Sequence, residues 1–441
     1  MNSPSQPKAP APGSMQAPMQ APKGTRDFYP EDMRLQNHLF DVWRRACLDF
    51  GFEEYEGPTF EHLELFTEKS GQEIVTQLYN FKDKAERDIA LRPEMTPTLA
   101  RMVNQKGNSL KLPLKWFSMP RLFRYEKAQR GRLREFFQLN MDVIGCETVA
   151  GEVELLSAII EMLKAFGLTA ADFSVRISSR RLLSEFLDGK GVPAEKKNAV
   201  YAALDKRAKI GPEAFRELLG KEGLTGADTD AIEAFFQCKS LGELAPFLPP
   251  GAVTTGLREL EQLFAYLQGL GYGDYAELDL SVVRGLAYYT GVVFEVYDKT
   301  VGLRALAGGG RYDNLLASLG GIPQTGVGFG MGDVVLAELL KEKGLLPSGR
   351  EPLDYYLVDV APPEDKLPRP ALLSLAQRLR SEGRRVGYAL NGEKMKKQMA
   401  QANDQAARNV LFFGSDRAPA DRFEVKDLTS GEQKVCPFEE L

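Results

Sequence analysis

Residues 121–145 read R-L-F-R-Y-E-K-A-Q-R-G-R-L-R-E-F-F-Q-L-N-M-D-V-I-G. Two amphipathic runs, 122–125 and 136–144, flank a loop that contains Gly131, and this pattern predicts a hairpin of two antiparallel strands. Between positions 121 and 134 the stretch holds six basic residues and a single acid, Glu126. Guanidinium forks bind phosphate oxygens in pairs, so the hairpin suits a ligand with several phosphates.

The same hairpin also carries groups that suit a flat base. Phe136 or Phe137 offers a stacking face, and the carboxylate of Glu126 can accept a hydrogen bond from an exocyclic amine. A second interpretation stays open at this point, namely a solvated basic hairpin at a sheet edge, where charges discourage edge-to-edge pairing.

Length and composition set the broad class. A chain of 441 residues has room for two or three domains, and its net charge of −5 excludes a broad basic coat, so contact with nucleic acid must be local. The four cysteines form no C-x-x-C pair, which argues against a zinc site or a disulfide framework and favours a reducing compartment. No apolar run approaches the ~20 residues that span a bilayer.

The first 22 residues are rich in Pro, Ala, Gln and Met and lack the apolar core of a signal peptide. They predict a disordered tail on a cytoplasmic protein. Apolar residues at helical spacing predict a helix over 32–50 that ends at Gly51, followed by a strand with Pro58. Alternating strand-like runs and one helix near 96–106 then predict an α+β fold with an antiparallel sheet.

Glycine and proline residues divide the later part of the chain into segments. A helix is expected over 152–166. From about 172 to 270, charged segments separated by Gly and Pro predict short helices. Strand patterns return at 278–283 and 292–296, and G-L-L-P-S-G-R-E-P at 344–352 indicates a linker. Beyond it, alternating strand and helix patterns from 355 to 413 predict a small α/β domain with a mostly parallel sheet.

Several blocks of this sequence occur together, and in this order, in one known family. They are K-G-T-R-D-F-Y-P at 23–30, L-R-P-E-M-T-P-T at 91–98, the hairpin itself, V-R-G-L-A-Y-Y-T-G-V-V-F-E at 283–295 and G-G-G-R-Y-D-N-L at 308–315. The chain resembles the histidyl-tRNA synthetases, and the hairpin resembles motif 2 of the class II aminoacyl-tRNA synthetases.

The resemblance implies a function and a domain plan. It implies ATP-dependent activation of L-histidine to histidyl-adenylate, with Mg²⁺, and transfer of the acyl group to tRNA(His). The class II catalytic domain would cover 23–345 with a helical insertion at about 172–270, and an anticodon-binding domain would cover 352–441. A homodimer is implied as well, with the helix over 32–50 and the Pro58 strand at its interface.

The resemblance also implies roles for individual residues, which fall into an ATP set and a histidine set. The catalytic arginines at the α-phosphate are Arg124 and Arg284, and the other ATP residues are Glu126 at the adenine amine, Arg132 at the outer phosphates and Phe136 stacked on adenine. The histidine residues are Glu94 and Thr96 at the ammonium, Gln138 near the substrate backbone, Asp142 and Tyr289 at the imidazole, and Tyr288 and Tyr312 as walls. No metal ligand is assigned to the protein itself.

Three positions depart from the usual family pattern. Asp142 stands in place of Glu, Ala287 in place of Asp, and Val335 in place of the motif 3 arginine that covers ATP. Arg304 or Arg311 is expected to supply the lost charge, and Arg311 is preferred because three glycines precede it. The missing arginine leaves an alternative function, that of a non-catalytic regulator such as the regulatory subunit of ATP phosphoribosyltransferase or a sensor of uncharged tRNA.

A last motif, G-x-G-x-G-x-G at 326–332, has the wrong spacing for a dinucleotide-binding loop. We expect instead a strand whose backbone is closely approached by other groups.

Overall fold

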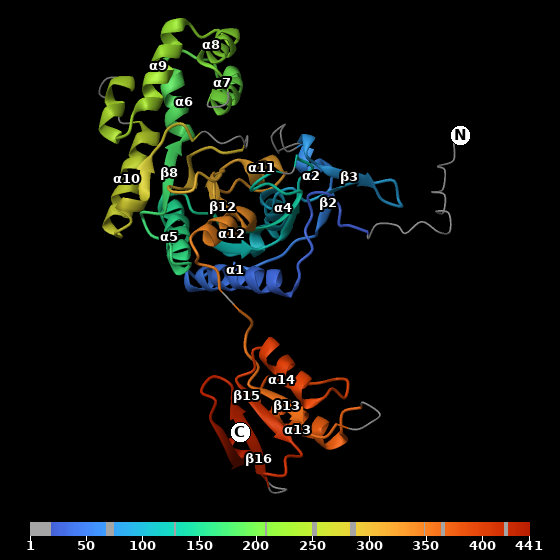
Figure 1. Ribbon diagram of the computed structural model, residues 1–441. Coiled ribbons are helices and arrows are strands. Elements are labelled where there is room, and N and C mark those ends of the chain that lie inside the picture. Colours follow the sequence, from blue (N-terminus) through green and yellow to red (C-terminus); the bar gives the residue numbers. More distant parts are fainter. Residues whose placement is uncertain are drawn as a thin grey trace. The chain divides into compact units, whose positions relative to one another are not determined.

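The structure, a computed structural model, describes residues 19–67, 75–127, 129–207, 210–248, 254–282, 288–347, 349–362, 367–418 and 422–441. The chain divides into two compact units, Met1–Leu346 and Pro347–Leu441 (Figure 1). Most of the predicted tail, the catalytic candidate Arg284 and the departure at Ala287 lie outside the described residues.

The first unit is built on a nine-stranded sheet in the order β1-β5-β7-β12-β11-β10-β8-β9, with β6 paired to β7. Its neighbours are antiparallel except for the parallel pairs β1/β5 and β8/β9. The strands are β1 (Glu53–Glu54), β5 (Leu114–Ser118), β6 (Arg121–Phe123), β7 (Glu135–Ile144), β8 (Phe173–Ser179), β9 (Ala276–Leu278), β10 (Val292–Asp298), β11 (Ala307–Arg311) and β12 (Gly326–Gly332). This confirms the predicted α+β class.

Two layers of helices cover this sheet. On one face α1 (Pro30–Asp49), α5 (Ala150–Ala165) and α12 (Asp333–Glu342) pack together and against β7 and β12. The other face meets α4 (Thr96–Lys106) and α11 (Leu315–Ser318), whose apolar residues share a core with Ile144 of β7. A small antiparallel sheet, in the order β2-β4-β3, is formed by β2 (Phe60–His62), β3 (Tyr79–Lys82) and β4 (Asp88–Leu91), and α2 (Glu64–Thr67) follows β2.

Helix α1 confirms the helix expected over 32–50. Pro30 starts it, the Asp32 carboxylate accepts from the Tyr29 N–H at 3.0 Å, and Gly51 with φ +72° follows its end. Its buried face, which includes Leu39 and Trp43, packs into the core of its own unit. The predicted strand with Pro58 is different: Pro58 lies in the connection between β1 and β2.

The region expected to be helical from about 172 begins instead with β8 of the central sheet. The helices follow as α6 (Arg180–Gly189), α7 (Ala194–Lys206), α8 (Pro212–Lys221), α9 (Gly226–Gln237) and α10 (Thr255–Gly269), with short 3-10 turns at Leu241–Phe247 and Gly273–Tyr275. Helices α7, α8 and α9 gather at one end of the unit (Figure 1). Within the described part of the strand expected over 278–283, only Leu278 lies in a strand, at the end of β9, because the Asp279 carboxylate accepts from the backbone N–H and the hydroxyl of Ser281 and closes a turn.

The second unit has a five-stranded sheet in the order β14-β13-β15-β16-β17. Its elements are β13 (Tyr355–Asp359), α13 (Pro370–Ser381), β14 (Val386–Tyr388), α14 (Met395–Asp404), β15 (Asn409–Phe413), β16 (Arg422–Asp427) and β17 (Gln433–Pro437), with a 3-10 turn at Phe438–Glu440. The three strands predicted between 355 and 413, now β13, β14 and β15, pair in parallel as expected, but the sheet as a whole is mixed because its other two strand pairs are antiparallel. The reason is the β16–β17 hairpin, whose turn the Asp427 carboxylate holds by accepting from the N–H groups of Thr429 and Ser430.

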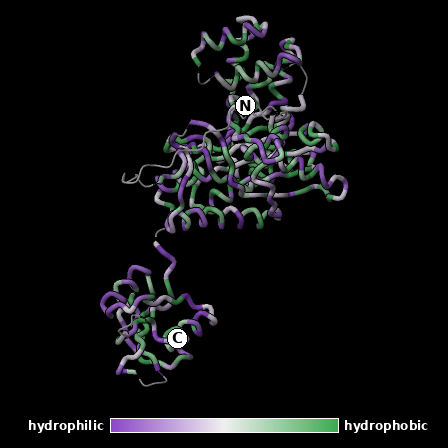
Figure 2. Tube along the Cα trace, turned by 90° about the vertical axis from the view of Figure 1, so that its right-hand side faces the viewer, coloured by the Kyte–Doolittle hydropathy of each residue, from purple (hydrophilic) through white to green (hydrophobic). Residues whose placement is uncertain are grey.

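Each unit has its own hydrophobic core, and hydrophobic segments (green) run through both in Figure 2. All four cysteines are free thiols, as their spacing predicts. Within the described ranges, no helix is long and apolar enough to cross a membrane.

Candidate active site

One face of β12 is bare, and the site is built on it. Val327, Phe329 and Met331 point into the core on the side of α5, so the alternating glycines, Gly326, Gly328, Gly330 and Gly332, face the other way. A Cβ atom on Gly328 would lie 1.9 Å from Oδ1 of Asp142, and one on Gly326 would lie 2.3 Å from Cε2 of Tyr312. These neighbouring side chains lie directly across the strand, which is the close approach that the glycine pattern predicts.

Asp142 is the acidic residue that covers the glycine face of β12. Its side chain is buried on β7 directly opposite Gly328, and the Tyr312 hydroxyl donates to its Oδ1 at 2.6 Å. Burial raises the pKa of Asp142 to about 7, although the bond from Tyr312 acts in the opposite direction. No cation is paired with Asp142 in the described part of the chain. A buried carboxylate in this state is poised to accept a hydrogen bond from a ligand.

Three tyrosines form the walls beside Asp142. The rings of Tyr288 and Tyr289 meet edge to face at 5.1 Å, and those of Tyr288 and Tyr312 do so at 5.9 Å. The Tyr288 hydroxyl donates to Oε2 of Glu94 at 2.8 Å, and Glu94 lies just before α4, which begins at Thr96. The structure therefore brings most of the predicted histidine set into one cluster of contacting side chains.

Two further hydroxyls in this pocket were not predicted. Tyr55 follows β1 and packs its ring at 5.6 Å from Trp116, the β5 residue that pairs with Asp142. The hydroxyls of Tyr55 and Ser118 are both buried and lie near each other, but neither has a hydrogen bond of good geometry among the residues described. Burial and the Asp142 charge raise the pKa of Tyr55, so it remains a donor. Only the sheet register reveals these groups, because Tyr55 is about ninety positions from Asp142 in sequence.

The hairpin runs from β6 into β7, and alternation along β7 decides between its two aromatic residues. Phe136 shares the face of Gln138 and Asp142, whereas Phe137 lies on the opposite face, where its ring meets Phe40 at 5.1 Å. The guanidinium of Arg124 lies 5.3 Å from the Phe136 ring and donates to the Pro93 carbonyl at 2.9 Å. Burial lowers the pKa of Arg124, which means that its charge is poorly solvated until an anion binds.

The other arginines of the hairpin are engaged within the protein. Arg132 forms an ion pair with Glu126 at 2.7 Å, and Arg134 donates to the Glu126 carbonyl at 3.1 Å. Arg130 reaches α12, where it pairs with Glu338 and, at 3.2 Å, with Glu342. Arg132 is therefore already paired within the hairpin in this structure.

Arg311 does not belong to this site, which corrects the expectation that it binds ATP. Its side chain leaves β11 on the face of Val327, opposite the glycines, and is 4% exposed. There its N–H groups donate to the Glu152 carboxylate at 2.5 and 2.6 Å and to the carbonyls of Cys146 and Thr148 at 2.8 Å. Asp313 accepts a longer contact at 3.4 Å, so all five donors are used. Arg311 is a structural residue that joins β11 to α5.

A second ion pair, between Arg26 and Asp333, contacts the backbone of the hairpin. Asp333 opens α12 with a fully buried side chain, which pairs with Arg26 at 2.6 Å and accepts from the Phe137 N–H at 3.0 Å. The carboxylate thereby ties the N-terminal block at 23–30 and the hairpin to the end of the glycine strand. Two residues on, Val335 takes the place where an arginine was expected.

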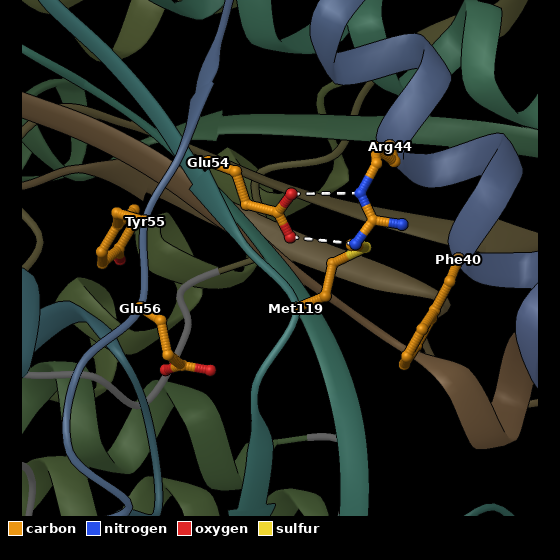
Figure 3. Close-up of a pocket in the computed structure, with 6 residues that line it drawn as sticks. All are labelled: Phe40, Arg44, Glu54, Tyr55, Glu56 and Met119. Atoms are coloured by element: carbon orange, nitrogen blue, oxygen red, sulfur yellow. Dashed lines mark hydrogen bonds and ion pairs between the residues drawn. The ribbon is translucent and has the colours of Figure 1, made fainter.

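A separate open cavity of about 420 Å³ lies between α1 and the segment after β1. It is lined by Phe40, Arg44, Glu54, Tyr55, Glu56 and Met119 (Figure 3). Arg44 donates to both carboxylate oxygens of Glu54 at 3.0 Å, as the dashed lines show. Tyr55 lines this cavity, and its ring also packs against Trp116, the β5 residue that pairs with Asp142.

Comparison with known proteins identifies relatives of the whole chain. The histidyl-tRNA synthetase family profile matches residues 24–333, and an anticodon-binding domain profile matches residues 358–441. The chain is 43% identical to the chloroplastic/mitochondrial histidine–tRNA ligase of Arabidopsis thaliana, over 95% of this chain and 85% of that one. It is 41% identical to the histidine–tRNA ligase of Opitutus terrae, over 96% and 97% of the two chains. The crystal structure of the histidyl-tRNA synthetase from Nostoc sp. PCC 7120 is similar with a TM-score of 0.78 and 27% identity, covering 96% of this chain and 98% of that one.

The bare face of β12 predicts that alanine substitutions at its glycines will lower stability by different amounts. Gly328→Ala should destabilise the first unit by roughly 1–3 kcal/mol, because its methyl group overlaps Asp142 and approaches the Met141 carbonyl at 3.0 Å. Gly332→Ala is the control, since nothing lies within 4 Å of its added Cβ. Thermal unfolding of both variants measures the difference. Adding Asp142→Ala should recover part of the loss, and an equal effect of the two glycine variants would contradict this account.

The buried carboxylate predicts a pH-dependent cost to stability. The folded-state pKa of Asp142 is raised to about 7, so between pH 4 and 7 the folded chain holds a proton that the unfolded chain releases, and its stability falls as pH rises. Asp142→Asn removes this titration and retains an acceptor for Tyr312. The variant should gain stability over the wild type between pH 4 and 7, by at most about 4 kcal/mol. Unfolding at pH 4.5 and 8 tests this, with exposed Asp274→Asn as control, and a gain that is equal at both pH values would refute it.

Proposed function

The chain belongs to the histidyl-tRNA synthetase family, and we propose that its reaction takes place on the bare face of β12, between the hairpin and the three tyrosines. Its activity is that of an aminoacyl-tRNA ligase, which joins histidine to tRNA at the expense of ATP. The observation that carries the proposed location is the convergence of Asp142, Gln138 and Arg124 on one face of β7 and its neighbours.

We infer that the histidine side chain is recognised at Asp142. An imidazole N–H would donate to the carboxylate, and the hydroxyl of Tyr289 would meet the second ring nitrogen, since a neutral imidazole has one donor and one acceptor. Tyr312 holds Asp142 in place, and Glu94 with Thr96 would bind the ammonium group. A side chain without matching polar atoms would leave the buried carboxylate unpaired, which makes such a pocket selective.

The adenosine triphosphate is proposed to lie along the hairpin. Phe136 would stack on adenine, Glu126 would accept from its amine, and Arg132 would bind the outer phosphates once freed from Glu126. A carboxylate oxygen of histidine attacks the α-phosphorus, the bond to the bridging oxygen breaks, and pyrophosphate leaves with its electron pair. Arg124 and Arg284 are proposed to bind the charge that develops at the α-phosphate, and Arg284 is proposed from the family resemblance alone.

Mg²⁺ would enter with ATP as part of the substrate. Among the side chains that the structure describes, no group of three or more His, Cys, Asp or Glu could hold a metal ion. Phosphate oxygens and water, which Mg²⁺ favours, would therefore supply most of its ligands.

The second step is proposed to transfer the histidyl group from the adenylate to a hydroxyl at the 3′ end of the tRNA, with AMP as leaving group. The second unit matches anticodon-binding domains and would hold the distal end of the tRNA. Lys394 and Lys396 at the start of α14 are exposed and suit phosphate contacts there.

The regulator alternative is not favoured by the similarities. Both relatives at about two fifths identity are ligases, and the match includes the anticodon-binding unit. A cytoplasmic location remains our proposal, and it rests on the cysteine usage.

We also propose that the chain works as a homodimer. The apolar face of α1 is covered within its own unit, so the interface would use what remains exposed nearby, namely the cavity between α1 and 54–56, Leu48 and Phe60. Both of these apolar side chains are more than half exposed, at 54% and 55%. A partner that covers them would remove apolar surface from water.

The function and its domain plan are tested by one comparison. The full chain should catalyse histidine-dependent exchange between ATP and pyrophosphate and should charge tRNA(His). A chain that ends at Leu346 should retain exchange within about threefold, because the proposed ATP and histidine residues all precede this point. Its tRNA charging should fall at least about tenfold, since anticodon contacts are lost. No exchange in the full chain would refute the function, and equal losses in both assays would refute the division of labour.

The homodimer is tested by sedimentation of the full chain at micromolar concentration. We expect a dimer, and Phe60→Glu should shift it towards monomer because a charge would be buried in the interface. Leu390→Glu, at a residue that is 73% exposed in the second unit, is the matched control and should have no effect. A wild-type monomer with full activity would rule the dimer out.

A further inference from the structure

An exposed arginine outside the hairpin stands at its tip. A Cβ atom placed on Gly131 would lie 3.7 Å from Cδ of Arg304 and 3.4 Å from Cγ2 of Val335. The stem of Arg304 and the side chain of Val335 therefore meet at the same turn, although Val335 lies in α12, 31 positions further along the chain. Arg304 itself lies in the loop between β10 and β11.

This arginine differs from those of the hairpin because its charge is not engaged. Arg304 is exposed, and within the described ranges it has no hydrogen bond or ion pair. Arg130, Arg132 and Arg134 all donate to carboxylates or carbonyls, and Arg311 is buried on the far face. Arg304 thus places beside Gly131 a guanidinium that no described residue engages.

The loop that carries Arg304 is held by a single carboxylate. Asp298, the last residue of β10, accepts from four consecutive backbone N–H groups, those of residues 300, 301, 302 and 303, at 3.1, 2.5, 2.9 and 2.7 Å. Burial opposes the charge of Asp298, but these bonds outweigh it and its pKa is lowered. The backbone immediately before Arg304 is therefore fixed, so less freedom is lost when its side chain binds a ligand.

We propose that Arg304 binds the outer phosphates of ATP, from across the hairpin tip, and so supplies the charge that Val335 lacks. This rests on the proposed function of the hairpin. Val335 is almost buried and adds no charge, whereas the guanidinium of Arg304 can reach a phosphate with two parallel N–H groups. The residue acts on the β- and γ-phosphates only, so it contributes to binding of ATP and not to binding of the adenylate.

The proposal is tested with Arg304→Ala in the full chain by ATP–pyrophosphate exchange. The KM for ATP should rise about 10- to 100-fold, as expected for loss of a charged hydrogen-bonded contact, while the KM for histidine stays within about twofold. Affinity for a non-hydrolysable histidyl-adenylate analogue, which lacks the outer phosphates, should be unchanged. An unchanged KM for ATP, or an equal loss of affinity for ATP and the analogue, would overturn the proposal.

Two further variants make the test specific. In the Arg304→Ala background, Val335→Arg should restore much of the ATP affinity, because it returns a guanidinium to the same turn. Arg216→Ala, at an exposed arginine of α8, is the control and should leave both KM values unchanged. Arg124→Ala tests the proposed function itself: if it abolishes exchange while Arg304→Ala does not weaken ATP, only the role of Arg304 is wrong. If Arg124→Ala leaves exchange intact, the hairpin is not the ATP site.

Discussion

The site depends on a strand that carries no side chains on one face. Tyr312 and Asp142 lie across β12 at distances from Gly326 and Gly328 that no Cβ atom would permit. Because β12 is central in the sheet, its bare face creates a polar recess where neighbouring strands would otherwise be packed with apolar groups. The opposite face of the same strand is fully apolar and fixes its position against α5. One face of β12 thus packs into the core, and its other face leaves room for the side chains of Asp142 and Tyr312.

Three buried carboxylates lie near β12, and they differ in whether a cation is paired with them. Glu152 is paired with Arg311, and Asp333 is paired with Arg26, so each buried charge has a partner and its removal would leave the other uncompensated. Among the described residues, Asp142 has the Tyr312 hydroxyl as its hydrogen-bond partner and no cation, and its pKa is raised to about 7. A buried carboxylate without a cation is costly to the fold, and we propose that a matching ligand relieves this cost.

The arginines of the hairpin also differ in whether they have partners within the protein. They are numerous, but in the structure most of them are used to hold Glu126, α12 and the backbone of the loop. What distinguishes Arg124 is burial beside Phe136, and what distinguishes Arg304 is a fixed loop and an exposed, unengaged guanidinium at the turn. A count of basic residues would therefore overstate the number that await a phosphate.

Periodicity in the sequence by itself determined the α+β class, the helix expected over 32–50 and the glycine strand, because it is a local property of the chain. The order of its motifs, through their resemblance to a known family, made Asp142 and Arg124 site candidates. The sequence misplaced Arg311, because two adjacent residues of a strand point to opposite faces and only the pairing of β11 with β12 shows which face holds the site. It gave no sign of Tyr55, Ser118 or the Arg26–Asp333 pair, whose partners lie far away in the sequence. These were decided by the tertiary structure, because burial and partnership of a polar group depend on the neighbours that folding brings to it.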